Sequence, residues 1–98
     1  MTSILFLLLK SPHEYCDLEI LGKISGEAPR SAVLLNDAAL FAVNKEAGER
    51  LRPWVDEVYV MRDDLEARGL PVQGDVSVID YGKLVDLIMD EFDQTVTI

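Results

Sequence analysis

Short apolar runs alternate along the chain with segments of helical spacing. The first run, residues 2–9, is apolar on both faces, as in central strands of a parallel sheet that helices cover on both sides. Further runs over residues 32–35, 55–61 and 76–79 have the length of strands. A short last strand over residues 95–98 would bring the total from four to five.

The residues after the first run have the signals of a helix start. Ser11 can cap the helix, Pro12 can occupy its first position, and Glu14 can reach back to complete a capping box. We therefore expect a helix that begins at Ser11, continues its apolar stripe to Ile24 and ends at Gly26.

Polar residues also stand where the next helices would begin. Asn36 and Asp37 offer an N-cap for a short helix over residues 38–43. Residues 45–52 would add a further turn or two before Pro53 stops them. Two short helices are therefore expected between the second and third strands.

The last two helices carry clearer end signals. Asp63 or Asp64 can cap a helix that runs through Arg68, and Gly69 suits the left-handed position that ends it. Arg68 near that end complements the helix dipole. Asp80 caps the last helix, whose buried stripe has the 3, 4 spacing of Leu84, Leu87, Ile88 and Phe92.

Strands separated by helices imply right-handed crossovers and a mostly parallel sheet. The predicted fold is therefore α/β, a three-layer sheet of four to five strands with helices on both faces, similar to flavodoxin. The chain of 98 residues fits one domain, residues 1–98. So small a domain gains from an oligomer interface. In such sheets, sites lie beyond the carboxyl ends of the strands.

Composition narrows the function. The net charge of −9 disfavours direct binding to nucleic acids, but it is compatible with a basic partner subunit. The apolar start is followed at once by Lys10 and is too short for a secretory signal or a membrane helix. One cysteine cannot form an internal disulfide or a cysteine pair for zinc, and the single histidine, His13, does not support a histidine-based metal site. A cytoplasmic location is expected. No cofactor is predicted, because the glycines form no phosphate-binding pattern.

Cys16 is the one residue that could give the chain covalent chemistry of its own. In a helix capped by Ser11 it would lie in the second turn, where the dipole effect has faded. Its neighbours also disfavour a thiolate, because they are acidic: Glu14, Asp17 and Glu19. This favours an inert thiol. If Asp17 instead caps a later helix, Cys16 lies in a loop at the strand end, which suits a sulfur acceptor better.

Four aspartates fall at the expected strand ends: Asp37, Asp63, Asp64 and Asp80. They resemble the acidic pockets that bind magnesium, but helix capping accounts for all four without a metal. Tyr81 is a candidate for a subunit interface. Trp54 is a candidate interface anchor or a residue of the core.

Segments at the strand ends resemble one family. They are Lys10-Ser11-Pro12, the run Asp64-Leu65-Glu66-Ala67-Arg68-Gly69, and Ile79-Asp80-Tyr81, with a weaker match around Leu34-Leu35-Asn36-Asp37-Ala38. In this order and spacing, which covers nearly the whole chain, the sequence resembles the DsrH/TusB family of sulfur-relay proteins.

The resemblance implies a DsrE-like fold and work beside DsrE/TusD and DsrF/TusC subunits, in tRNA 2-thiouridine formation or in sulfur oxidation. In that family the main sulfur-carrying cysteine follows the third strand of the DsrE/TusD subunit. Met61, Arg62 and Asp63 occupy the matching place here. Some DsrH-type members have a cysteine in the first helix, at about Leu21 of this chain, five residues after Cys16.

Three hypotheses follow. The leading one is an accessory subunit of a sulfur-relay complex that has no turnover of its own. The alternatives are a direct sulfur carrier that uses Cys16, and a homo-oligomeric module that binds a ligand or regulates. The residues expected to form the family motif or an interface are Ser11, Pro12, Asp37, Asp64, Arg68, Gly69, Asp80 and Tyr81.

Overall fold

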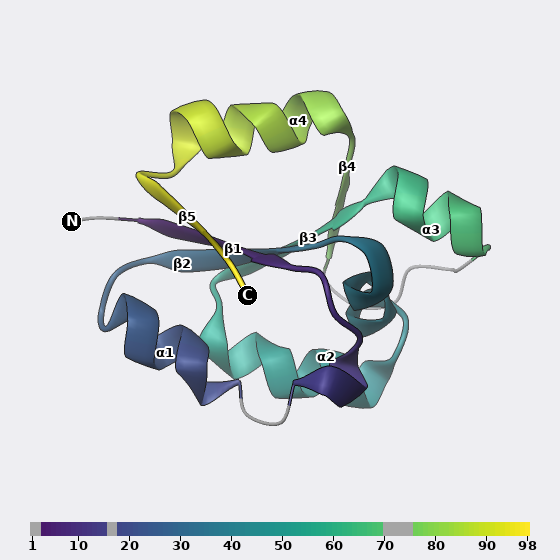
Figure 1. Cartoon of the computed structure of the whole chain (residues 1–98), viewed down its shortest axis with the longest axis horizontal. Coiled ribbons are helices and arrows are strands. Elements are labelled where there is room, and N and C mark those ends of the chain that lie inside the picture. Colours follow the sequence, from purple (N-terminus) through teal and green to yellow (C-terminus); the bar gives the residue numbers. More distant parts are fainter. Residues whose placement is uncertain (1–2, 16–17, 70–75) are drawn as a thin grey trace.

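A five-stranded sheet organises the part of the chain that the structure describes (Figure 1). This computed structural model describes residues 3–15, 18–69 and 76–98. The strands are β1 (Ile4–Leu8), β2 (Arg30–Leu34), β3 (Glu57–Met61), β4 (Ser77–Ile79) and β5 (Gln94–Thr97). All neighbours pair in parallel, in the order β4-β3-β2-β1-β5. The chain thus steps outward from β1 to β4 and returns to the other side of β1.

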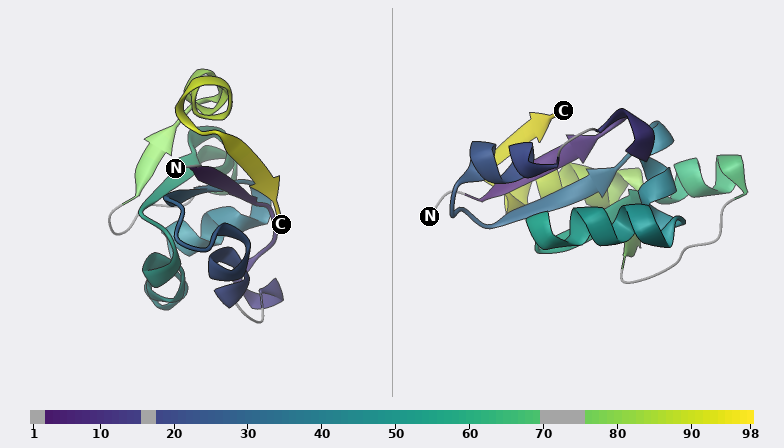
Figure 2. Two further views of the ribbon diagram at one scale, coloured as in Figure 1. Left: turned by 90° about the vertical axis from the view of Figure 1, so that its left-hand side faces the viewer. Right: turned by 90° about the horizontal axis from the view of Figure 1, so that it is seen from below.

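Helices cover both faces of this sheet (Figure 2). On one face lie α1 (Glu19–Ser25) and α2 (Lys45–Leu51), while α4 (Tyr81–Asp86) crosses the other (Figure 1). Right-handed crossovers explain this, because the return from β4 to β5 runs in the opposite direction to the earlier steps. The predicted three-layer parallel α/β fold is confirmed. None of the described helices is long and apolar enough to span a membrane.

Shorter helical segments complete the connections. Three are 3₁₀ turns: η1 (Pro12–Glu14), η2 (Asn36–Ala42) and η3 (Arg52–Trp54). The α-helix α3 (Arg62–Arg68) follows β3 directly, and α4 continues as the π-helical segment η4 (Leu87–Glu91). Residues 38–42 are therefore part of a 3₁₀ segment where a helix over residues 38–43 was expected, and Pro53 lies inside a final 3₁₀ turn.

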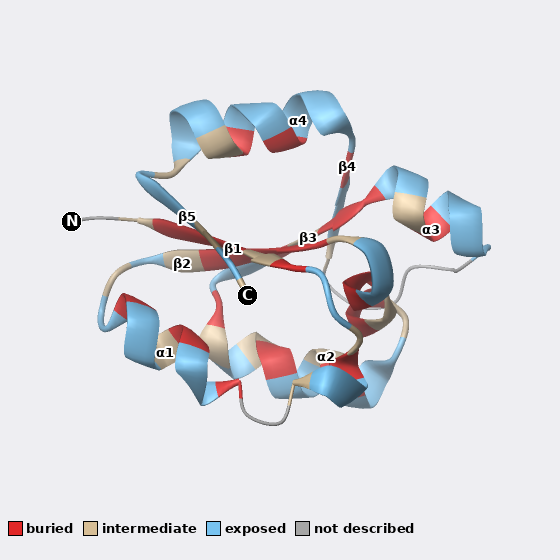
Figure 3. Ribbon diagram, in the orientation of Figure 1, coloured by how far each residue is buried: buried red, intermediate tan, exposed pale blue. Residues whose placement is uncertain are grey.

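Two separate cores lie on the two faces of the sheet (Figure 3). Phe6 and Leu8 of β1 belong to the larger core, on the face of the sheet that α1 and α2 cover. Leu5 points to the other face and joins a smaller core formed with Val33, Met61, Ile79, Leu84 and Leu87. Because β1 contributes buried side chains to both cores, its sequence is apolar on both faces.

The helix that was expected to begin at Ser11 is shorter than predicted. The capping box is present, with the backbone N–H of Ser11 donating to Glu14 Oε2 at 3.0 Å. It closes only the 3₁₀ turn η1, because Tyr15 is extended and its hydroxyl donates to the Ile98 carbonyl oxygen at 3.0 Å. The next helix, α1, starts at Glu19. A tertiary contact therefore overrides the local helix signal.

The C-terminal signal of α3 and the N-cap of α4 behave as predicted. Gly69 ends α3 in the left-handed region, with φ 61° and ψ 36°. Asp80 caps α4 and accepts from the Lys83 backbone N–H at 2.9 Å. The stripe of α4 is buried at Leu84 and Leu87 and covers the smaller core.

Candidate functional site at the carboxyl edge of the sheet

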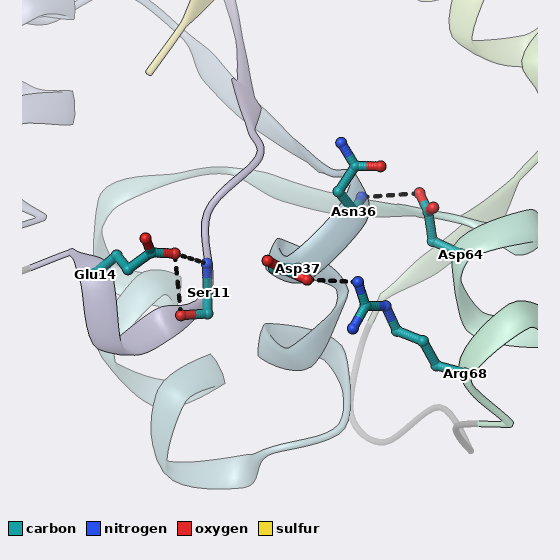
Figure 4. Close-up of polar contacts among 6 residues, drawn as sticks. All are labelled: Ser11, Glu14, Asn36, Asp37, Asp64 and Arg68. Carbon is teal, nitrogen blue, oxygen red and sulfur yellow. Dashed lines mark hydrogen bonds and ion pairs between the residues drawn. The ribbon is translucent and has the colours of Figure 1, made fainter.

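The carboxyl ends of β1, β2 and β3 bring three segments together at one edge of the sheet. They are η1 after β1, η2 after β2 and α3 after β3. Figure 4 shows the polar side chains that these segments place there. This is the edge at which parallel α/β sheets bind ligands.

A left-handed asparagine starts η2. Asn36 has φ 50°, a conformation that asparagine tolerates better than most residues. Its backbone N–H donates to Asp64 Oδ2 at 3.0 Å (Figure 4). The expectation that Asp64 caps α3 is therefore wrong, because the N-cap position is Met61 and Asp64 lies in the first turn. Its carboxylate instead joins α3 to the end of β2.

An ion pair links the same two segments. Arg68 donates to Asp37 Oδ1 at 2.5 Å, with side-chain exposures of 39% and 53% (Figure 4). Asp37 was expected to cap a helix, but the N-cap position of η2 is Leu35. At this exposure the pair contributes about 0–1 kcal/mol. Asp64 and Arg68 are four residues apart on α3, so both can reach toward η2.

The segment after β1 makes hydrogen bonds of its own, distinct from those between η2 and α3. Pro12 is buried in η1, and Ser11 bonds only locally to Glu14 among the contacts of Figure 4. The Lys10 N–H donates to the Tyr15 hydroxyl at 3.3 Å, and Arg50 donates to the Tyr15 carbonyl oxygen at 3.0 Å. Tyr15 therefore joins η1 to α2, as well as to the residue that follows β5.

The remaining predicted residues lie elsewhere on the same edge or on other surfaces. Asp80 caps α4 beside the outer strand β4, and Tyr81 is exposed on the first turn of that helix. Asp63 does not occupy the N-cap position of α3, so its predicted capping role is wrong. Trp54 is half-buried against the larger core, in agreement with a core role. Cys16 and Asp17 lie outside the described residues.

No cysteine stands at the end of β3, where Met61 is followed by Arg62. Met61 is buried in the smaller core, and the chain turns straight into α3 at Arg62. Within residues 3–15, 18–69 and 76–98, no three His, Cys, Asp or Glu side chains gather to hold a metal ion. The only cysteine of the chain is Cys16. Polar contacts at this edge therefore fix neighbouring segments in place.

A second polar cluster involves residues of β3, α4 and η4. The Tyr59 hydroxyl donates to Glu57 Oε2 at 2.5 Å, and Lys83 donates to Glu91 Oε2 at 2.6 Å. Burial, the hydrogen bond to Glu57, and the charges of Glu57 and Glu91 raise the pKa of Tyr59 to about 12. The hydrogen bond to Glu91 raises the pKa of Lys83.

This raised pKa predicts a loss of stability in alkali. Between pH 10 and about 12 the unfolded chain releases the Tyr59 proton while the folded chain keeps it, so the free energy of unfolding falls as pH rises. Across this window the wild type should lose about 1 kcal/mol more than Tyr59→Phe, after allowance for the partly exposed ring. Urea unfolding of both proteins at pH 9 to 12 measures the difference, and parallel curves would contradict it.

Comparison with known proteins agrees with the resemblance seen in the sequence. The family model described as DsrH like protein matches residues 10–94, which include η1, η2, α3 and α4. A search of curated proteins found no match to the chain. The matched segment also includes Asp37, Asp64 and Arg68, which the fold brings together at the carboxyl edge. The chain therefore belongs to the DsrH-like family, and its role is related to sulfur relay.

Proposed function

We propose that the chain is an accessory subunit of a sulfur-relay complex. It would bind DsrE/TusD-like and DsrF/TusC-like subunits in the cytoplasm and help to shape the site at which a partner cysteine passes on its persulfide. The proposal is supported most directly by the end of β3, where buried Met61 and then Arg62 stand in place of a thiol. A subunit without a thiol there can serve the relay through its surfaces.

Native mass spectrometry tests this proposal directly. The chain would be co-expressed with the DsrE-like and DsrF-like subunits of the same organism, and each subunit would also be analysed alone. We expect a hetero-oligomer that contains all three chains, because a small domain gains stability by covering exposed apolar surface. A chain that stays free of both partners at micromolar concentration would overturn the proposal.

Direct sulfur transfer through Cys16 is the second candidate. One observation favours it: α1 begins at Glu19, so the helix that would have placed Cys16 in its second turn does not start at Ser11. Against it stand the acidic neighbours in the sequence, Glu14, Asp17 and Glu19, which disfavour a thiolate.

Intact-mass measurement separates the two candidates. The chain would be mixed with a persulfide-loaded DsrE-like subunit and analysed without reductant. An accessory subunit gains no sulfur, whereas a carrier gains one sulfur atom that Cys16→Ser abolishes. Sulfur that appears on the wild type and is absent from the variant would establish the carrier function and exclude a purely accessory one.

A further inference from the structure

An exposed apolar stripe runs along the outer side of the last helix. Tyr81, Val85 and Met89 follow one another at intervals of four residues, and they are 62%, 54% and 73% exposed. Their side chains face away from the smaller core, which α4 and η4 cover with Leu84 and Leu87. This helix lies alone on its face of the sheet (Figures 1 and 2), so no other described helix covers the stripe. We call these three residues the α4 stripe.

The π turn limits how far the α4 stripe drifts around the helix. In an α-helix, residues four apart drift by about 40° around the axis, so a third residue at this spacing would turn away from the first. The segment η4 winds more widely, with the Phe92 N–H donating to the Leu87 carbonyl oxygen at 3.1 Å. A wider turn rotates less per residue and reverses the drift. The π turn therefore reduces the offset of Met89 from Tyr81 around the helix axis.

Carboxylates border the α4 stripe. Residues 81–91 contain three acidic side chains, Asp86, Asp90 and Glu91, and a single cation, Lys83. The ammonium of Lys83 is paired with Glu91 at 2.6 Å, so it does not offset the other two carboxylates. The surface is thus an apolar ridge with a negative border. Such a ridge fits an apolar groove that is bordered by lysine or arginine.

A second copy of this chain is a poor occupant for the stripe. Two-fold pairing of identical helices would offer the carboxylates of one copy no unpaired cation within residues 81–91 of the other, because Lys83 is already paired with Glu91. Each copy also carries a net charge of −9. Like charges brought together across an interface oppose binding, whereas a basic partner is attracted from a distance.

We infer that the α4 stripe is a docking surface for a partner subunit whose apolar groove is lined at its edges by lysine or arginine. The inference rests on the proposed accessory function and adds to it the surface and the chemistry of the contact. Tyr81 supplies an aromatic anchor at one end, and Met89 adapts to the groove at the other.

The test compares two pairs of substitutions on opposite faces of the domain. Val85→Glu with Met89→Glu places charge in the α4 stripe. Ile20→Glu with Ile24→Glu is the matched control, because both isoleucines are 43% exposed and four residues apart on α1. Each double variant would be titrated against the purified DsrE-like and DsrF-like subunits, separately and together. Circular dichroism would confirm that both variants are folded.

We expect the stripe variant to bind at least about 30-fold more weakly than the wild type, and the control to stay within about threefold. The double variant Asp86→Lys with Asp90→Lys should bind the same partner subunit with a weaker dependence on salt concentration than the wild type does. If the wild type binds and the stripe variant binds equally well, the docking surface is excluded while the accessory function stands. Equal loss in stripe and control variants also overturns this assignment. Failure of the wild type to bind either subunit overturns both proposals.

Discussion

Replacing Leu87 by alanine should lower the free energy of unfolding by about 3 kcal/mol, the largest effect that we expect from a single residue of α4 or η4. Leu87 has no exposed surface and packs in the smaller core. Among the described residues, that core has six buried members and five partly buried ones around them, so few neighbours can move to fill the space that alanine would leave. A domain of this size has about 5–15 kcal/mol of stability in all, so the loss is severe.

Met89→Ala is the matched control for this prediction. Met89 lies two residues further along the same segment but is 73% exposed, so its truncation should change stability by no more than about 0.5 kcal/mol. Urea unfolding followed by circular dichroism measures both variants. Equal losses would mean that η4 does not present these two side chains to opposite sides, and would also remove the basis for the α4 stripe.

The contrast between Leu87 and Met89 shows what hydrophobic spacing can predict. Spacing of 3 and 4 identifies the buried side of α4 from the sequence, because burial leaves a strong periodic pattern. The same helix carries a second apolar series, Tyr81, Val85 and Met89, whose spacing of four is also visible in the sequence. Only the structure separates the two, since it shows that Leu84 and Leu87 pack on the sheet while Tyr81, Val85 and Met89 are exposed.

At the carboxyl edge, too, contacts between residues close in sequence can be predicted, whereas contacts between residues distant in sequence cannot. The Ser11–Glu14 capping box spans three residues, and the sequence predicts it correctly. The Asp37–Arg68 pair spans 31 residues, and it depends on how η2 and α3 meet. Sequence reasoning treats each aspartate as a local cap, because a cap needs only its own helix. Asp80 fits that rule, whereas Asp37 and Asp64 bind across segments.

Arg30 is a similar case that the sequence does not reveal, because the cationic residues are scattered along the chain. It lies at the start of β2, and its guanidinium donates to the Ser25 hydroxyl at 2.8 Å and to the Gly26 carbonyl oxygen at 2.9 Å. It also donates to the Trp54 carbonyl oxygen. The Arg30 side chain therefore connects β2 by hydrogen bonds both to the C-terminal end of α1 and to η3. Its positive charge also complements the dipole at the C-terminal end of α1.

Arg30→Ala should consequently lower the free energy of unfolding by about 2 kcal/mol, because it leaves partly buried acceptors without their donor. Arg30→Lys should recover only part of this, since an ammonium cannot reproduce the fixed fork of a guanidinium. Arg68→Ala is the control, as its exposed ion pair with Asp37 contributes no more than about 1 kcal/mol. If urea unfolding gives the two alanine variants equal losses, the bonds of Arg30 do not fasten α1. A larger loss in Arg30→Ala than in Arg68→Ala would show that the hydrogen bonds of Arg30, at the amino end of β2, stabilise the domain more than the ion pair at the carboxyl edge of the sheet does.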